Sequence, residues 1–108
     1  MSSIVLLDTS VYLNVLDVPG FNQDRYLILD QFGKLIDDGC HFLLPMATIW
    51  ETGNHIADLP DAYRRREFAQ LLVSDVQKAI KGESPYRPTH FPDQKQFLEW
   101  LKDFPQYV

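Results

Sequence analysis

Apolar residues follow two different patterns along the chain, and each pattern predicts a different kind of element. Short, mainly apolar runs at 4–7 and 40–44 are typical of strands buried on both faces. A strand, helix, strand order of this length favours a parallel pair. Residues 84–92 carry three prolines and are expected to form a loop. Elsewhere apolar residues recur every three or four positions, which predicts helices over 10–16, 24–38, 46–56, 61–80 and 93–101.

The composition is that of one small globular domain. Hydrophobic residues make up 45% of the 108 residues and charged residues 23%, which is close to ordinary globular usage. The single cysteine, Cys40, excludes an internal disulfide and fits a reducing compartment. No apolar run reaches the roughly 20 residues that span a bilayer, and no basic segment precedes the first run. We therefore expect a single cytoplasmic α/β domain over 1–108, with no membrane partner.

Two carboxylates follow the two predicted strands. Asp8 comes directly after the first run, and Glu51 lies about two helical turns beyond the second. Because the carboxyl ends of neighbouring parallel strands share one edge of a sheet, we expect these side chains to converge there. Converging carboxylates repel one another, and a hard divalent cation relieves that repulsion. The pattern predicts an Mg²⁺ site held by Asp8 and Glu51, with Ser10 orienting Asp8 or a water molecule.

Both acids also have a purely structural interpretation. Asp8 is equally suited to a turn or a helix cap, and Glu51 to the exposed face of a helix. Thr9 and Ser10 are good N-cap residues for the helix that follows them. His55 lies four residues after Glu51 and shares its helix face, either as a second polar group at the site or as a surface residue.

The segment from Ile4 to Asn14, with its Asp8-Thr9-Ser10 triplet, resembles the opening of a PIN domain. Leu43-Leu44-Pro45 followed by Glu51 is similar to that family's second acidic motif, so the resemblance covers about the first half of the chain. It implies a PIN-like three-layer α/β/α fold with a short parallel sheet. It also implies endoribonuclease activity that depends on Mg²⁺ or Mn²⁺, as in the VapC-type toxins of bacterial toxin–antitoxin pairs. Asp8 and Glu51 would be metal ligands and Ser10 a supporting residue, with RNA as substrate and an antitoxin as a protein partner.

The chain departs from the family pattern in its second half. The family has a third acid, and often a fourth, near the start of a later helix and at the end of a later strand. Asp93 and Asp103 lie late in the chain, but neither precedes a small-residue helix or follows an apolar strand. The expectation is therefore an N-terminal part of a longer PIN domain, or a naturally degenerate one.

Two other functions compete with metal-dependent cleavage. A non-catalytic PIN-like module that binds RNA or a partner protein would need no late acids. A small phosphatase or nucleotide-binding domain fits less well, because Asp8-Thr9-Ser10 lacks a second aspartate two positions later.

Basic and aromatic residues indicate candidate surfaces for binding RNA or a second copy of the chain. Residues 1–60 hold eight acids and two bases, a net charge of −6, whereas residues 61–108 hold seven acids and eight bases, a net charge of +1. Arg64-Arg65-Arg66 would fan around roughly 200° of a helix, as a solvated face or as contacts to RNA phosphates. Trp50 and Trp100 are interpreted as core or dimer contacts, with base stacking as the alternative. Exposed apolar residues on a short sheet would favour a homodimer.

Overall fold

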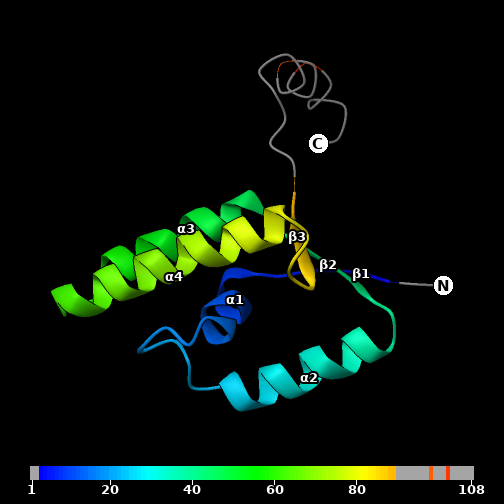
Figure 1. Ribbon diagram of the computed structural model, residues 1–108, viewed down its shortest axis with the longest axis horizontal. Coiled ribbons are helices and arrows are strands. Elements are labelled where there is room, and N and C mark those ends of the chain that lie inside the picture. Colours follow the sequence, from blue (N-terminus) through cyan, green and yellow to red (C-terminus); the bar gives the residue numbers. More distant parts are fainter. Residues whose placement is uncertain (1–2, 90–97, 99–101, 103–108) are drawn as a thin grey trace.

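The computed structural model describes residues 3–89, 98 and 102, which form a mixed α/β fold (Figure 1). Six of the elements agree with the sequence predictions to within a few residues. The helix predicted over 93–101 lies outside the described residues, apart from Leu98. The elements, in chain order, are β1 (Ile4–Leu6), α1 (Thr9–Val15), α2 (Arg25–Asp37), β2 (His41–Leu44), α3 (Met46–Ala57), α4 (Ala62–Ile80) and β3 (Tyr86–Pro88).

The described strands form one parallel sheet with β2 in the middle. Val5 of β1 pairs with Phe42, and on the other side Phe42 pairs with Tyr86 of β3. Helices α1 and α2 connect β1 to β2, and α3 and α4 connect β2 to β3 (Figure 1). The prediction of a parallel α/β arrangement is therefore confirmed.

The prediction of a loop throughout 84–92 is wrong, because Tyr86–Pro88 form β3. The backbone N–H of Thr89 donates to the carbonyl of Leu44 at 3.0 Å, which continues the pairing past the strand. Proline is tolerated in an edge strand, since one side of such a strand has no ladder to interrupt. Burial of the Tyr86 ring, which is 4% exposed, holds the segment against the sheet.

The apolar run at 4–7 predicted a strand buried on both faces, and this prediction is wrong for β1. Ile4 and Leu6 are 67% and 62% exposed, whereas Leu7, just after the strand, is 1% exposed. Successive strand residues point to opposite faces, so one face of β1 packs on the core and the other is open in the described structure. The strand also pairs with β2 along one side only, among the residues described.

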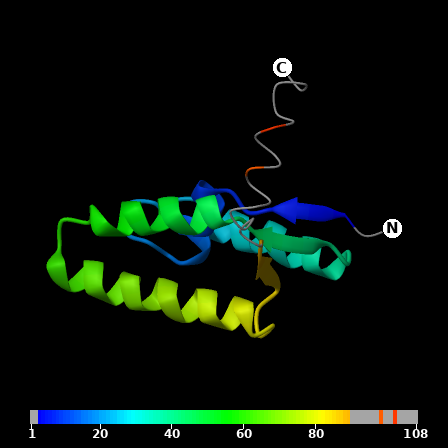
Figure 2. The same ribbon diagram turned by 90° about the horizontal axis from the view of Figure 1, so that it is seen from above.

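The core lies where α1 meets the sheet and the α3–α4 pair. Helix α1 contacts both α2 and α3, and α3 packs against α4. Figures 1 and 2 show α3 and α4 lying side by side along most of their length. Trp50 does not belong to this core, because its side chain is 73% exposed. The largest fully buried side chains are Leu7, Tyr12, Val18, Leu44 and Thr52.

A carboxylate of α4 ties α1 to β3. The Tyr12 hydroxyl donates to Asp75 Oδ2 at 2.7 Å, and the Tyr86 hydroxyl donates to the same oxygen. The two rings meet edge-on, with their centroids 5.9 Å apart. Burial, followed by the hydrogen bond to Asp75 and its negative charge, raises the pKa of Tyr12 and of Tyr86 above the ordinary tyrosine value.

We expect the protein to lose stability above about pH 10. Tyrosine in an unfolded chain ionises near pH 10, whereas the pKa values of folded Tyr12 and Tyr86 are higher. The stability that this difference contributes is complete below about pH 10 and is lost as the pH rises toward the folded pKa values. Urea unfolding between about pH 8 and pH 11 measures the free energy of unfolding against pH.

The matched variants separate buried from exposed tyrosines. Tyr12→Phe/Tyr86→Phe should flatten the fall in the free energy of unfolding above about pH 10. Tyr26→Phe/Tyr63→Phe removes two tyrosines that are 91% and 71% exposed, and should leave the fall unchanged. Equal slopes for the two double variants would contradict the assignment.

Candidate functional site

Asp8 begins α1 at the carboxyl end of β1. Its Oδ1 accepts hydrogen bonds from the backbone N–H of Val11 and from the Ser10 hydroxyl, both at 2.9 Å. Asp8 is therefore the N-cap residue of α1. The assignment of that cap to Thr9 or Ser10 is wrong, because both residues already lie within the helix.

Glu51 reaches the same edge of the sheet from α3. The Thr9 hydroxyl donates to Glu51 Oε2 at 2.5 Å, joining residues that are 42 positions apart. The buried hydroxyl of Thr48 donates to the carbonyl of Leu7 at 2.8 Å, which fixes the start of α3 against the end of β1. The strand pairing and these two bonds bring the loop after β1 and the first turns of α3 together.

One pocket of about 500 Å³ is lined by Asp8, Thr9, Ser10 and Glu51. Leu6 and Leu7 from the end of β1, together with Pro45, Ala47 and Thr48 around the start of α3, form the rest of its wall. Both carboxylates are exposed to solvent. The tertiary structure thus places the two acids that follow the predicted strands in a single open pocket.

A second pocket of about 400 Å³ adjoins the first and shares Thr9, Ser10 and Glu51 with it. Its other wall includes Asp24 and His55. The His55 ring packs on Phe21, with the ring centroids 4.8 Å apart. His55 is half-buried at this pocket rather than fully on the surface.

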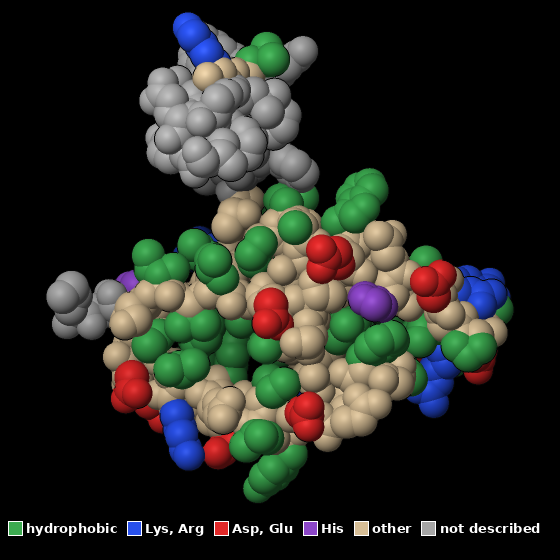
Figure 3. All heavy atoms as spheres, turned by 180° about the vertical axis from the view of Figure 1, so that it is seen from behind, with side chains coloured by type: hydrophobic (Ala, Val, Ile, Leu, Met, Phe, Trp, Pro, Cys, Tyr) green, Lys and Arg blue, Asp and Glu red, His purple; other side chains and the backbone are tan. Residues whose placement is uncertain are grey.

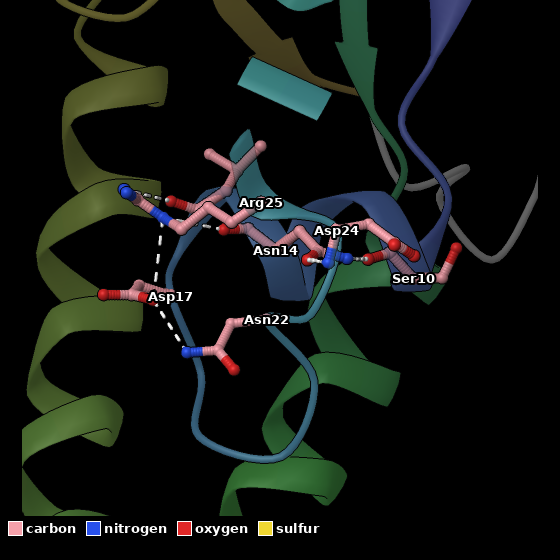
Figure 4. A network of polar contacts seen from close by, with 7 residues as sticks. Ser10, Asn14, Asp17, Asn22, Asp24 and Arg25 are labelled. Atoms are coloured by element: carbon pink, nitrogen blue, oxygen red, sulfur yellow. Dashed lines mark hydrogen bonds and ion pairs between the residues drawn. The ribbon is translucent and has the colours of Figure 1, made fainter. Parts of the chain in front are cut away.

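Asn14 holds the loop that carries Asp24. Its Nδ2 donates to the carbonyl of Ser10 at 2.9 Å, and its Oδ1 accepts from the backbone N–H of Asp24 at 3.1 Å (Figure 4). Arg25 Nε donates to the Asn14 carbonyl at 3.0 Å and lies 3.7 Å from Asp17 Oδ1. Both polar ends of the Asn14 side chain are used, so it positions the loop. The sequence reasoning missed Asp24, because no periodic pattern connects a loop acid to the strand ends.

A cation held here by Asp8 and Glu51 would be weakly coordinated and largely hydrated. Mg²⁺ commonly takes one or two carboxylates and keeps several waters. Within the described chain, Asp8 Oδ2 and Glu51 Oε1 accept no hydrogen bond, so each carboxylate retains a free oxygen. Residues 3–89, 98 and 102 contain no group of three or more His, Cys, Asp or Glu side chains placed to hold a metal. Asp93 and Asp103 lie outside these residues.

Comparisons of the chain with protein-family models, with curated proteins and with solved structures gave no significant match. The resemblance to PIN domains therefore rests on the two sequence motifs, and the site rests on its own geometry. None of the described helices combines the length and the apolar character that crossing a membrane requires.

Proposed function

We propose that the pocket lined by Asp8 and Glu51 hydrolyses RNA phosphodiester bonds with Mg²⁺ or Mn²⁺, within a PIN-like three-layer domain. The observation that supports this is the placement of Asp8, which follows β1, and of Glu51, on α3, in one open pocket at the carboxyl end of the described parallel strands. The PIN-like motifs add an antitoxin protein as the expected partner of such an enzyme.

The side chains of this chain fix the two carboxylates and leave them accessible. Ser10 and the α1 backbone hold Asp8 through Oδ1, and Thr9 holds Glu51 through Oε2. Asp8 and Glu51 would hold the cation through their remaining oxygens. A bound Mg²⁺ or Mn²⁺ supplies Lewis acidity and lowers the pKa of water. Without a cation the two negative charges repel RNA phosphates, so cleavage should require the ion.

We expect cleavage of single-stranded RNA by the full-length gene product to depend on Mn²⁺ or Mg²⁺ and on both acids. Asp8→Asn and Glu51→Gln should each lower the rate at least roughly 10–100-fold. This is the loss observed when a group that only supports a metal ligand is removed, and a ligand itself should matter at least as much. Asparagine is as good an N-cap as aspartate, so Asp8→Asn tests the charge and leaves α1 in place. The measurement is the initial rate of cleavage of a labelled RNA, with and without chelator.

Two matched substitutions control for the loss of a charge. Asp30→Asn and Glu67→Gln remove acids that do not line either site pocket and should keep the wild-type rate. Undiminished cleavage by both Asp8→Asn and Glu51→Gln would reject these residues as metal ligands.

The second candidate function is a non-catalytic module that binds RNA or a protein. It is favoured by the structural hydrogen bonds that Asp8 and Glu51 already accept, and by the lack of a third ligand within the described chain. Calorimetric titration with Mn²⁺ discriminates the two functions. The hydrolase should bind Mn²⁺ and lose that binding in Asp8→Asn, whereas a binding module needs no ion at Asp8.

A further inference from the structure

Helices α3 and α4 leave an apolar groove of about 500 Å³ between them. Gly53 and Ala57 line it from α3, and Ala69 and Val73 line it from α4. A Cβ atom placed on Gly53 would meet a Leu72 methyl at 3.7 Å, so the two helices come close along the floor of the groove. The groove is separate from the pocket that contains Asp8 and Glu51.

Apolar side chains at the groove and on the same face of α3 are open to solvent. Val73, which lines the groove, is 56% exposed, and Trp50 is 73% exposed. Trp50 lies one helical turn before Gly53, and Ala57 one turn after it, so these three residues share a face of α3. An apolar groove with exposed apolar residues along it is the kind of surface that binds a partner.

The groove is also bordered by positive charge. Arg65 and Arg66 line it near the start of α4. Arg65 donates to the carbonyl of Leu59 at 2.5 Å, which anchors it at that end. The ion pairs within the described residues are Arg25–Asp17 and Lys34–Asp30, so neither arginine is neutralised there. Figure 3 shows Lys and Arg side chains at the end of the molecule where α3 turns into α4, with Asp and Glu side chains beside them.

We propose that this groove binds an amphipathic helix of a different protein, with apolar residues facing the groove and acidic residues facing Arg65 and Arg66. A helix laid into a groove between two others buries its apolar stripe at spacings of three and four residues. Charge complementarity selects an acidic helix, because the charged residues that line the groove, Arg65 and Arg66, are both basic although the whole chain carries a net charge of −5.

A second copy of this chain is a poorer occupant. Two copies that met through this face would bring the arginines that line both grooves into one interface, where like charges repel. The inference does not depend on the proposed hydrolysis, since it uses none of the residues of that site.

Binding of synthetic helical peptides tests the proposal. The probes are two fluorescein-labelled peptides of about three heptads with the same leucine stripe, one flanked by Glu and the other by Lys. Fluorescence anisotropy should show that wild-type protein binds the Glu peptide at least about tenfold more tightly than the Lys peptide. Arg66→Glu cancels the charge of Arg65 and should abolish that preference. Ala69→Phe, which fills the groove, should weaken binding of both peptides.

Arg64→Glu is the matched control. Arg64 is two positions from Arg66, about 200° around α4, and does not line the groove. Arg64→Glu changes the net charge of the protein as much as Arg66→Glu does, but it should leave binding of the Glu peptide near wild type. Equal weakening by Arg64→Glu and Arg66→Glu, or no binding of the Glu peptide, would overturn the proposal. So would a homodimer in sedimentation velocity that Ala69→Phe dissociates. Circular dichroism checks that each variant is folded.

Discussion

Replacing Asp75 with alanine should lower the free energy of unfolding by about 2–6 kcal/mol. The substitution leaves the hydroxyls of Tyr12 and Tyr86 without their shared acceptor. These side chains are 0% and 4% exposed, so water cannot replace the lost acceptor at full strength. A buried polar group left unsatisfied costs about 1–3 kcal/mol, and here there are two. Chemical denaturation of the wild type and the variant measures the difference.

Three further variants show whether the hydroxyls are the cause. Asp75→Asn keeps an acceptor oxygen and should cost less than Asp75→Ala. The triple variant Asp75→Ala/Tyr12→Phe/Tyr86→Phe removes both orphaned donors and should recover part of the loss. Asp30→Ala removes an exposed acid of α2, in a surface pair with Lys34, and should cost about 0.5 kcal/mol or less. A loss in Asp75→Ala no larger than in Asp30→Ala would contradict the role given to the shared carboxylate.

Leu44→Ala should lower the free energy of unfolding by about 2–5 kcal/mol. Leu44 ends the central strand β2 and is 0% exposed. It packs in the cluster that also contains Phe42 and Tyr86. Truncation removes buried apolar atoms and leaves a cavity that close-packed neighbours fill only in part. Thermal and chemical denaturation should agree on the size of the loss.

Leu6→Ala makes the same chemical change in the same sheet at an exposed position. The Leu6 side chain is 62% exposed on the open face of β1. Its truncation should cost about 0.5 kcal/mol or less. Losses of equal size in Leu44→Ala and Leu6→Ala would show that the face of β1 that carries Leu6 is covered in solution.

The sequence by itself determined the elements that depend on local pattern. The strands at β1 and β2 were predictable because short apolar runs end at Asp8 and Pro45. Helices α2 and α4 were predictable because their apolar residues recur at helical spacing, and Gly39 ends α2 with a φ of 78° that favours glycine. The placement of Asp8 and Glu51 in one pocket followed from parallel strand order, which is itself a consequence of connection length.

Only the tertiary structure decided the features that depend on contacts between distant residues. Strand β3 has only three residues, one of them proline, so its local sequence does not predict a strand. The strand forms because it pairs with an edge of β2 and because Asp75 accepts the Tyr86 hydroxyl. The exposure of Leu6 and Trp50 could not be predicted either, since the spacing of apolar residues in the sequence is the same whether or not another element covers them. The α3–α4 groove arises from how two helices pack. Periodicity records which residues share a face, whereas the packing of separate elements decides what that face meets.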